Sequence, residues 1–348
     1  MRTWERSNAY DILPLMTGFV SHPSFIHHNT GPGHPERPDR LRAVYRALKL
    51  SGLLTSPDPF PDFKIDLGDL PRAAKPLIEV APIAADEETL RLVHSQAHID
   101  TIRDFCAAGG GLIDGADTAV VAESFDLAKL AAGATVTATT AVLEGRVKRA
   151  FAAARPPGHH AEPDRAMGFC LFSNIAIAAR MAQKTFGVDH VAIIDFDVHH
   201  GNGTQAAFED DPSVFFASLH QDPRTCYPHT GFARETGSGM GEGFTLNIPF
   251  PPGTEVGAYL HALDEIILPR LHDFGPEILF ISAGFDAHID DPLADIHLTE
   301  DGFAQITRRL VEFADVNCHG RVVSTLEGGY NLRALGRSVV KHVMALEG

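Results

Sequence analysis

The stretch HVAIIDFDVHHGNG, residues 190–203, decides the fold and the candidate site of this chain. It begins with an apolar run typical of a buried strand and continues into two acids, two histidines and a glycine-rich turn. Asp195, Asp197 and His199 are spaced two residues apart, so in an extended segment their side chains fall on one side. Unpaired buried charges are costly, and we therefore expect a bound cation to compensate them.

The remaining sequence alternates short apolar, β-branched runs with longer helical stretches. The runs predict strands at 149–154, 190–196, 213–219, 243–250, 277–283 and 321–326. The longer stretches predict helices at 126–145, 172–186, 257–274 and 302–316. Strands that alternate with helices predict an α/β fold, with a mostly parallel sheet covered on both faces.

Polar residues recur where these predicted strands end. RPPGHH (155–160) follows the first strand, SLH (218–220) ends the third, GFDAH (284–288) follows the fifth, and EGGYNL (327–332) follows the last. The carboxyl ends of parallel strands meet at one edge of a sheet, which is where open α/β folds place their sites. Each cluster alone would be explained as a loop, but together they predict one site.

Asp197, His199 and Asp286 are the candidate metal ligands. Taken singly, such an acid is more often a helix cap or a turn residue, but the grouping favours a cation site. An Asp, Asp, His set with an open position suits Zn²⁺ and an activated water. Ligands rich in oxygen also accept Fe²⁺, Co²⁺ or Mn²⁺, so the metal stays open.

His159, His160 and Tyr330 are the candidate catalytic residues. Neutral imidazoles beside a metal site suit general base and acid catalysis near neutral pH. Tyr330 follows two glycines, and its phenol would donate a hydrogen bond to a developing oxyanion. The alternatives are surface or structural histidines and an ordinary buried tyrosine.

These motifs, in order and spacing, resemble the zinc-dependent histone deacetylases and the bacterial acetylpolyamine amidohydrolases, from about residue 15 to the end. The segments that carry the resemblance are GPGHPERPDRL (31–41), RPPGHHA (155–161), GFC (168–170), DFDVHHGNGTQ (195–205), SAGFDAH (282–288) and LEGGYNL (326–332). It implies one deacetylase domain over residues 1–348, with 1–15 as an N-terminal extension and 56–77 as a surface loop. The implied fold is the three-layer arginase/deacetylase type, with a central, mostly parallel, eight-stranded sheet.

The resemblance also implies roles for single residues. Asp197, His199 and Asp286 match the zinc ligands, and His159 and His160 match the tandem histidines, of which His160 is the main proton shuttle. Tyr330 matches the tyrosine that stabilises the oxyanion. Two supporting residues are implied as well: Asp195 orients His159, and Asn202 is the partner of His160. An asparagine there, in place of aspartate, is similar to class II-like members of bacterial type.

A structural K⁺ site beside the zinc is implied by the same resemblance. Its residues, partly through backbone carbonyls, are Asp195, Asp197, His199, Ser218 and Leu219. A second monovalent site is expected near Phe208, Asp211 and Val214.

The expected substrate tunnel is lined by Phe169, Tyr227, Gly168, Leu293 and Glu123. Phe169 and Tyr227 match an aromatic pair around the acyl-lysine chain, although core aromatics are the alternative. Polyamine-selective relatives in the class II branch carry glutamate where this chain has Leu293, so the resemblance favours removal of acetyl or other acyl groups from acyl-lysine. Glu123 on the rim and the acidic chain keep open the alternative of an amidohydrolase for small N-acetylated polyamines. An arginase-like manganese ureohydrolase and a non-enzymatic acyl-lysine reader are weaker alternatives.

Composition limits the partners. The net charge of −16 and pI near 5.5 argue against a nucleic-acid surface, which requires a basic patch. No run of 18 apolar residues or signal-peptide pattern is present, and the four cysteines form no CxxC pair. We therefore expect a cytoplasmic protein without membrane partners, and leave a homo-oligomer open.

Overall fold

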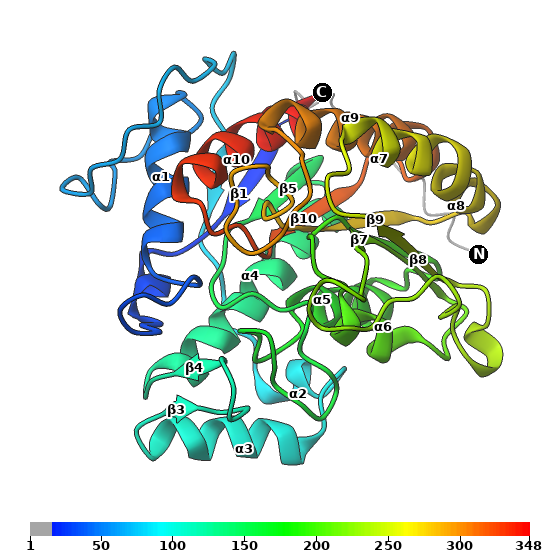
Figure 1. The fold of residues 1–348 in the computed structure, drawn as a ribbon, viewed down its shortest axis with the longest axis horizontal. Coiled ribbons are helices and arrows are strands. Elements are labelled where there is room, and N and C mark those ends of the chain that lie inside the picture. The colour runs from blue at the N-terminus through cyan, green and yellow to red at the C-terminus, as the bar shows by residue number, and fades with distance from the viewer. Residues whose placement is uncertain (1–15) are drawn as a thin grey trace, which may run out of the picture.

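Eight parallel strands form the central sheet of the molecule (Figure 1). The computed structural model describes residues 16–348, so the predicted extension at 1–15 lies outside the described residues. The sheet order is β2-β1-β5-β10-β9-β6-β7-β8, and every neighbouring pair in it is parallel. The strands are β1 (Thr17–Val20), β2 (Ile78–Val80), β5 (Arg149–Ala152), β6 (Val191–Asp195), β7 (Val214–Gln221), β8 (Thr245–Phe250), β9 (Ile278–Ala283) and β10 (Val322–Leu326). A small antiparallel pair, β3 (Gly111–Leu112) and β4 (Ala119–Val120), lies apart from this sheet.

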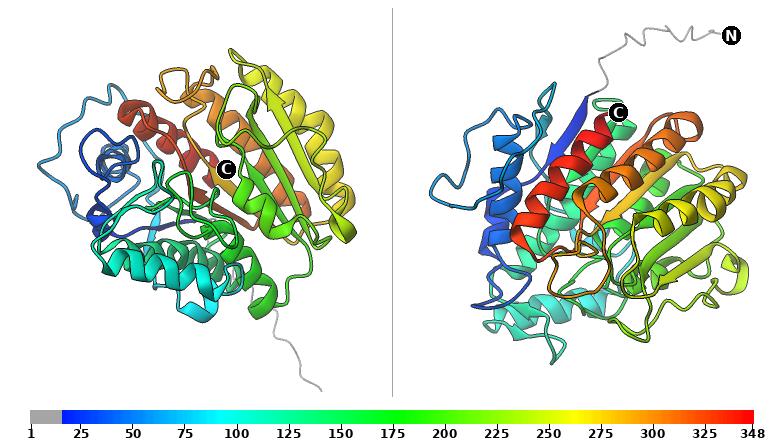
Figure 2. Two further views of the ribbon diagram at one scale, coloured as in Figure 1. Left: turned by 60° about the horizontal axis from the view of Figure 1, so that its bottom comes forward. Right: turned by 45° about the horizontal axis from the view of Figure 1, so that its top comes forward.

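Helices cover both faces of the sheet, which makes the three layers that the sequence predicts (Figure 2). One face carries α4 (Ser124–Leu143), α5 (Asn174–Phe186) and α6 (Asn202–Phe208), with α2 (Glu87–Leu90) and α3 (Gln96–Ala107) outside them. The other face carries α1 (Asp39–Leu50), α7 (Val256–Ala262), α8 (Leu268–Phe274), α9 (Glu300–Asn317) and α10 (Leu332–Glu347). Because helices cover both faces, the central strands are buried along their whole length and their sequences read as continuous apolar runs.

The six strands predicted from sequence all occur, and each end lies within two residues of the expected bound. The predicted helix at 257–274 is helical throughout but contains a π-helical segment, η3 (Leu263–Ile267), between α7 and α8. Pro269 follows that segment and has no N–H to continue the regular pattern, which accounts for the local change of pitch. Between Leu50 and Ile78 the chain forms no helix or strand, although Leu67 and Leu77 are buried in the core.

The sheet order places the polar strand ends next to one another. β5, β10, β9, β6 and β7 are consecutive neighbours, and each is followed or ended by one of the polar clusters. Asp195, at the end of β6, pairs in register with Ser282 of β9 on one side and Ser218 of β7 on the other. Side chains far apart in sequence therefore meet at one edge. Within residues 16–348, no helix combines the length and the apolar character needed to cross a membrane.

Candidate active site

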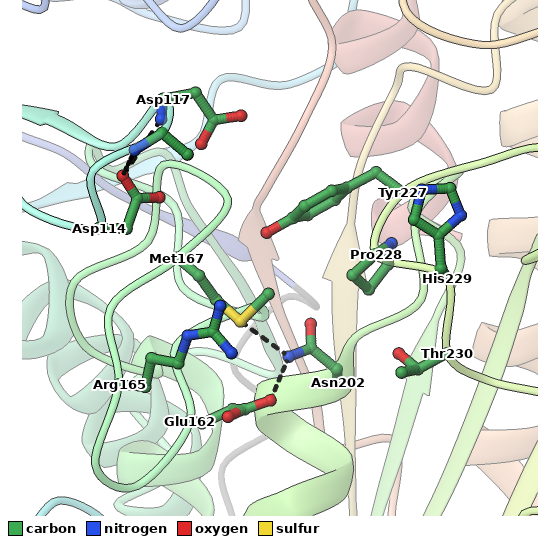
Figure 3. Close-up of a pocket in the computed structure, with 11 residues that line it drawn as sticks. Asp114, Asp117, Glu162, Arg165, Met167, Asn202, Tyr227, Pro228, His229 and Thr230 are labelled. Carbon is green, nitrogen blue, oxygen red and sulfur yellow. Dashed lines mark hydrogen bonds between the residues drawn. The ribbon is translucent and has the colours of Figure 1, made fainter.

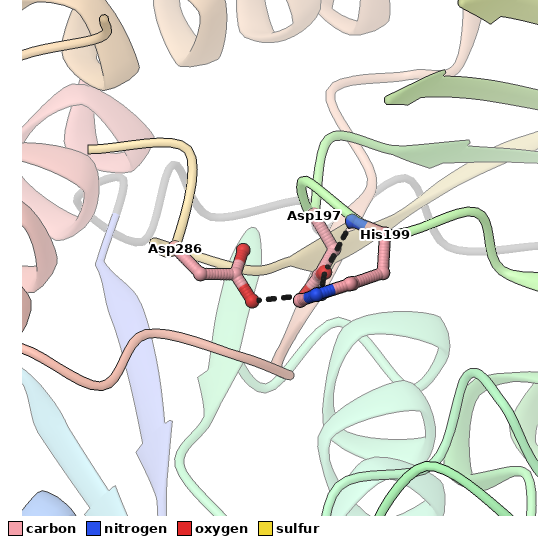
Figure 4. A group of neighbouring side chains, drawn as sticks. All are labelled: Asp197, His199 and Asp286. Atoms are coloured by element: carbon pink, nitrogen blue, oxygen red, sulfur yellow. Dashed lines mark hydrogen bonds and ion pairs between the residues drawn. The ribbon is translucent and has the colours of Figure 1, made fainter. Parts of the chain in front are cut away.

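Asp197, His199 and Asp286 meet at this edge of the sheet (Figure 4). Each offers one ligand atom, and these atoms lie within 4.8 Å of one another. His199 Nδ1 lies 3.1 Å from Asp197 Oδ1 and 3.2 Å from Asp286 Oδ2. All three residues are buried. The structure therefore brings together the three ligands expected from two separate strand ends.

Backbone donors hold the two carboxylates and leave one oxygen free. Asp197 accepts hydrogen bonds from the N–H of Gly328 at 2.8 Å and of His199 at 2.9 Å, and Asp286 Oδ1 accepts from the N–H of Val198 at 3.0 Å. Asp286 Oδ2 accepts no hydrogen bond of normal geometry among the described residues, and its polar neighbour is the ion-pair contact with His199 Nδ1 at 3.2 Å. A buried carboxylate oxygen without a donor is costly, so this donor set fits a divalent cation.

The charges support the same conclusion. Burial and the neighbouring Asp197 carboxylate both raise the pKa of Asp286. Two acids this close within a buried site stay ionised together only when positive charge lies beside them. Glycines make room for that arrangement: a Cβ on Gly284 would lie 1.9 Å from Asp197 Oδ2, and one on Gly328 would lie 1.9 Å from Asp286 Oδ2.

The tandem histidines lie beside this centre, with ring centroids 4.0 Å apart. His159 Nδ1 contacts Asp195 Oδ2 at 3.0 Å, and the partner expected from sequence is in place. Burial alone would lower the pKa of His159, but the carboxylates of Asp197 and Asp195 outweigh it and raise the pKa to about 10. The two acids thus stabilise the protonated form of His159.

His160 has the opposite character. Its Nδ1 contacts Asn202 Oδ1, a neutral amide oxygen, at 2.8 Å. Burial lowers the pKa of His160 well below its usual value, and the charges of His159 and His199 lower it further. Two adjacent histidines whose surroundings move their pKa values apart are typical of an acid–base pair with divided roles.

Tyr330 is buried and lines the same cavity as His160 and His199. Burial raises the pKa of its phenol well above the usual value, and the Asp286 carboxylate raises it further, so the hydroxyl stays protonated as a donor. The guanidinium of Arg40 lies 5.0 Å from the centre of the Tyr330 ring. The carboxylate of Asp291 accepts the backbone N–H groups of Tyr330 at 2.7 Å and Asn331 at 3.1 Å.

A cavity of about 370 Å³ reaches His199, one of the three candidate ligands. Four of the five expected tunnel residues line it, and they are Gly168, Phe169, Tyr227 and Leu293. A Cβ on Gly168 would lie 2.4 Å from His160 Cδ2, so only glycine allows this loop to approach the histidine. Phe169 itself has a left-handed backbone with φ 68°, and its N–H is held by Thr118 Oγ1 at 3.1 Å.

Glu123 is the expected tunnel residue that the structure does not place there. It is exposed, directly before α4, and does not line the cavity. Asp117, six residues earlier, lines it together with His34. Asp117 follows a turn in which Asp114 accepts the N–H groups of residues 116, 117 and 118. The sequence DGAD signals this turn, but not which acid faces the cavity.

The residues expected to bind K⁺ lie together. Asp195, Asp197, His199, Ser218 and Leu219 are buried, and the register of β6 with β7 pairs Asp195 with Ser218. At the second expected site, the Phe208 carbonyl accepts the N–H of Asp211 at 3.0 Å, and the Asp211 carbonyl accepts the N–H of Val214. The Asp211 carboxylate pairs with Arg180 and with Ser213.

Two buried acids that support the site were not identified from the sequence. Glu327 Oε2 accepts the N–H groups of Gly158 at 2.7 Å and His159 at 3.1 Å, which fixes the loop that carries the tandem histidines. Asp291 fixes the loop of Tyr330 by accepting the backbone N–H groups of residues 330 and 331. Both residues stand inside stretches already quoted or adjacent to them, but an acid that binds backbone N–H groups leaves no characteristic spacing.

The comparison with known protein families gives one match that spans most of the chain. The family model described as the histone deacetylase domain matches residues 34–346. A probable deacetylase of Archaeoglobus fulgidus is 39% identical over 318 residues, which cover 91% of this chain and 82% of that protein. A histone deacetylase-like amidohydrolase of Pseudomonas aeruginosa is 37% identical over 330 residues, which cover 94% of this chain and 79% of that protein.

A solved structure shows the same architecture. The crystal structure of the HDA15 HD domain superimposes with a TM-score of 0.86 at 35% identity, over 96% of this chain and 89% of that one. The predicted α/β fold with a central eight-stranded parallel sheet is thereby confirmed.

Proposed function

Because the chain belongs to the histone deacetylase domain family, we propose that it is a metal-dependent amidohydrolase that removes acetyl or other acyl groups from acyl-lysine in proteins or peptides. One observation carries the proposal. The ligand His199, the neutral imidazole of His160 and the phenol of Tyr330 all line a single cavity, whose other lining includes Phe169 and Tyr227.

Asp197, His199 and Asp286 would hold the metal, and the donor set suits Zn²⁺ while also accepting Fe²⁺ or Co²⁺. A divalent ion held there supplies Lewis-acid chemistry to an amide carbonyl. We also propose a structural K⁺ beside it, at Asp195, Asp197, His199, Ser218 and Leu219. The supporting observation is the burial of acids at the end of β6, directly beside β7.

His160 supplies the general base and then the general acid. Its Nδ1 is engaged by Asn202, so Nε2 is the atom that takes a proton from water and returns it to the leaving amine. Burial keeps the ring neutral, and it can therefore accept that proton. The protonated phenol of Tyr330 donates a hydrogen bond to the carbonyl oxygen as negative charge develops on it.

The lining of the cavity favours a long aliphatic chain. Phe169 and Tyr227 exclude water and pack against methylene groups, as the side chain of acyl-lysine requires. Leu293 at the opening carries no charge that would attract a remote ammonium group. The carboxylate of Asp117 supports the alternative, an amidohydrolase for small N-acetylated polyamines, because it lies on the same lining.

A panel of substrates tests the proposal. We would measure kcat/KM for acetyl-lysine peptides, longer acyl-lysine peptides and N-acetylputrescine, with protein whose metal content has been assayed and Tyr330→Phe as the matched inactive control. Preference for acyl-lysine peptides is the expected result. Preference for the acetylated polyamine would replace the proposed substrate, and no hydrolysis by metal-loaded protein would refute an amidohydrolase.

A further inference from the structure

A second cavity, of about 270 Å³, adjoins the tunnel (Figure 3). Tyr227 and Asp117 line both cavities. Asn202, Glu162 and Met167 line the second, and Figure 3 shows the Asn202 amide pointing its nitrogen toward the other two. Asn202 therefore connects His160 with a half-buried acid that the mechanism above does not use.

The hydrogen bonds fix which way the Asn202 amide faces. Its Nδ2 lies 2.8 Å from Glu162 Oε1, 3.3 Å from Met167 Sδ and 3.4 Å from the backbone oxygen of His160. All three neighbours accept hydrogen bonds, and an ionised carboxylate cannot donate one. A rotated amide would place its oxygen against three acceptors, so the strong acceptor Glu162 holds Nδ2 on its own side and Oδ1 toward His160.

This orientation decides the tautomer of His160. A neutral imidazole carries one N–H, and its position is set by what each ring nitrogen faces. Asn202 Oδ1 can only accept, so Nδ1 carries the hydrogen and Nε2 keeps its lone pair for the proton of water. With the amide reversed, Nδ2 would face Nδ1 and favour the tautomer whose Nε2 is already protonated and cannot act as a base.

We propose that Glu162 is a positioning residue that, through Asn202, holds His160 in the tautomer required of a general base. The inference rests on the proposed function. The backbone of Glu162 is fixed by a hydrogen bond from its N–H to the Arg165 carbonyl at 2.9 Å, which places its side chain beside Asn202. An aspartate at position 202 would need no such support, because both of its oxygens accept. The neighbouring His159 is an example, because its Nδ1 contacts a carboxylate, that of Asp195, directly.

Kinetics of matched variants test the inference in zinc-loaded protein. Glu162→Leu removes the acceptor, and we expect kcat to fall by roughly 10- to 100-fold with little change in KM, as is usual for lost supporting hydrogen bonds. Glu162→Gln keeps an acceptor oxygen and should recover most of that loss. Asp164→Asn removes an exposed acid of the same loop and should have no effect.

The same substitutions in an Asn202→Asp protein distinguish a positioning role of Glu162 from a merely structural one. In that background, Glu162→Leu should cost little in kcat, because a carboxylate at position 202 accepts from His160 in either orientation. An equal loss of kcat in both backgrounds would contradict the inference.

Nitrogen NMR of histidine-labelled, zinc-loaded protein reads the tautomer directly, with His160→Gln for assignment. The expected result is an Nδ1–H tautomer in the wild type and a shift toward Nε2–H in Glu162→Leu. An Nε2–H tautomer in the wild type, or an unchanged Nδ1–H tautomer in Glu162→Leu, would overturn the inference. This measurement needs no substrate. If the wild type hydrolyses no amide, the proposed function fails while the inference about His160 is still tested.

Discussion

Gly328 offers a sharp test of the metal centre, because its missing side chain is what leaves room for the ligands. It lies between β10 and Tyr330, and its N–H donates to Asp197 Oδ2 at 2.8 Å. A Cβ at this position would lie 1.9 Å from Asp286 Oδ2 and 2.7 Å from Asp197 Oδ2. The backbone of Gly328 is not left-handed, so alanine fits its conformation. The effect of Gly328→Ala is therefore confined to steric displacement of the two carboxylates.

The size of the effect follows from that overlap. Real Cβ atoms essentially never approach another atom closer than 3.0 Å, so Asp286 Oδ2 must move by about 1 Å. Metal–ligand distances tolerate deviations of only about 0.2 Å, and Asp286 would cease to be an effective ligand. Lost supporting contacts alone weaken metal binding by about 10–100-fold, so we expect at least the upper limit, or about 2.7 kcal/mol.

The assay is a titration of metal-free protein with Zn²⁺ against a chromophoric chelator. The matched control is Gly329→Ala, whose Cβ would meet Leu335 Cδ1 at 3.0 Å and whose φ of 116° is left-handed. That variant should lose stability but keep nearly the wild-type zinc affinity. If Gly328→Ala bound zinc as tightly as the wild type, or if both variants lost affinity equally, the assignment of Asp286 as a ligand would be refuted.

Four further predictions address the chemistry, the substrate and the stability. Tyr330→Phe should lower kcat by about 100–1,000-fold, as for other lost oxyanion donors, while metal analysis shows an unchanged zinc content. Asp286→Ala should lose the zinc itself, and equal metal loss in the two variants would contradict the assigned roles. Leu293→Glu should shift the kcat/KM ratio toward N-acetylated polyamines and away from acetyl-lysine peptides, because it adds a carboxylate at the opening of the tunnel. His342 is buried, and burial lowers its pKa to about 3. As the pH falls, this histidine is therefore protonated in the unfolded chain before it is protonated in the folded protein. Between about pH 7.5 and about pH 5, the free energy of unfolding of the wild type should therefore fall by about 2 kcal/mol more than that of His342→Asn. Urea denaturation of both proteins at each pH measures this difference.

The sheet was largely predictable, because its central strands are buried on both faces and read as continuous apolar runs. β1 and β2 were not identified individually, for a physical reason: they have four and three residues, and β2 lies at the edge, only partly buried. α10 was not among the predicted helices, although its buried residues recur at helical spacing, and it begins at Leu332, the last residue of the polar EGGYNL segment. The implied total of eight strands came from the family resemblance and is confirmed by the sheet.

The grouping of the three candidate ligands could be predicted because each stands just after an apolar run. The strand itself ends at Asp195, and Asp197 and His199 lie in the bend that follows it rather than in the extended segment expected, while Asp286 follows the neighbouring strand in the sheet. The acid at the tunnel was predicted as Glu123, but Asp117 lies there instead. Asp117 lies in the turn of residues 113–118, between the short strands β3 and β4. The direction of a side chain in a turn depends on contacts with distant parts of the chain.

The supporting contacts of the site follow one scheme that no sequence pattern reveals. Four buried acids of the strand-end loops each accept a backbone N–H of a different loop, so the loops hold one another. The pairs are Asp197 with Gly328, Asp286 with Val198, Glu327 with Gly158, and Asp291 with Tyr330. A backbone donor has no residue identity, and only the order of strands in the sheet decides which N–H faces which acid. The same scheme means that Asp291 positions Tyr330 although it contacts that residue only through the backbone.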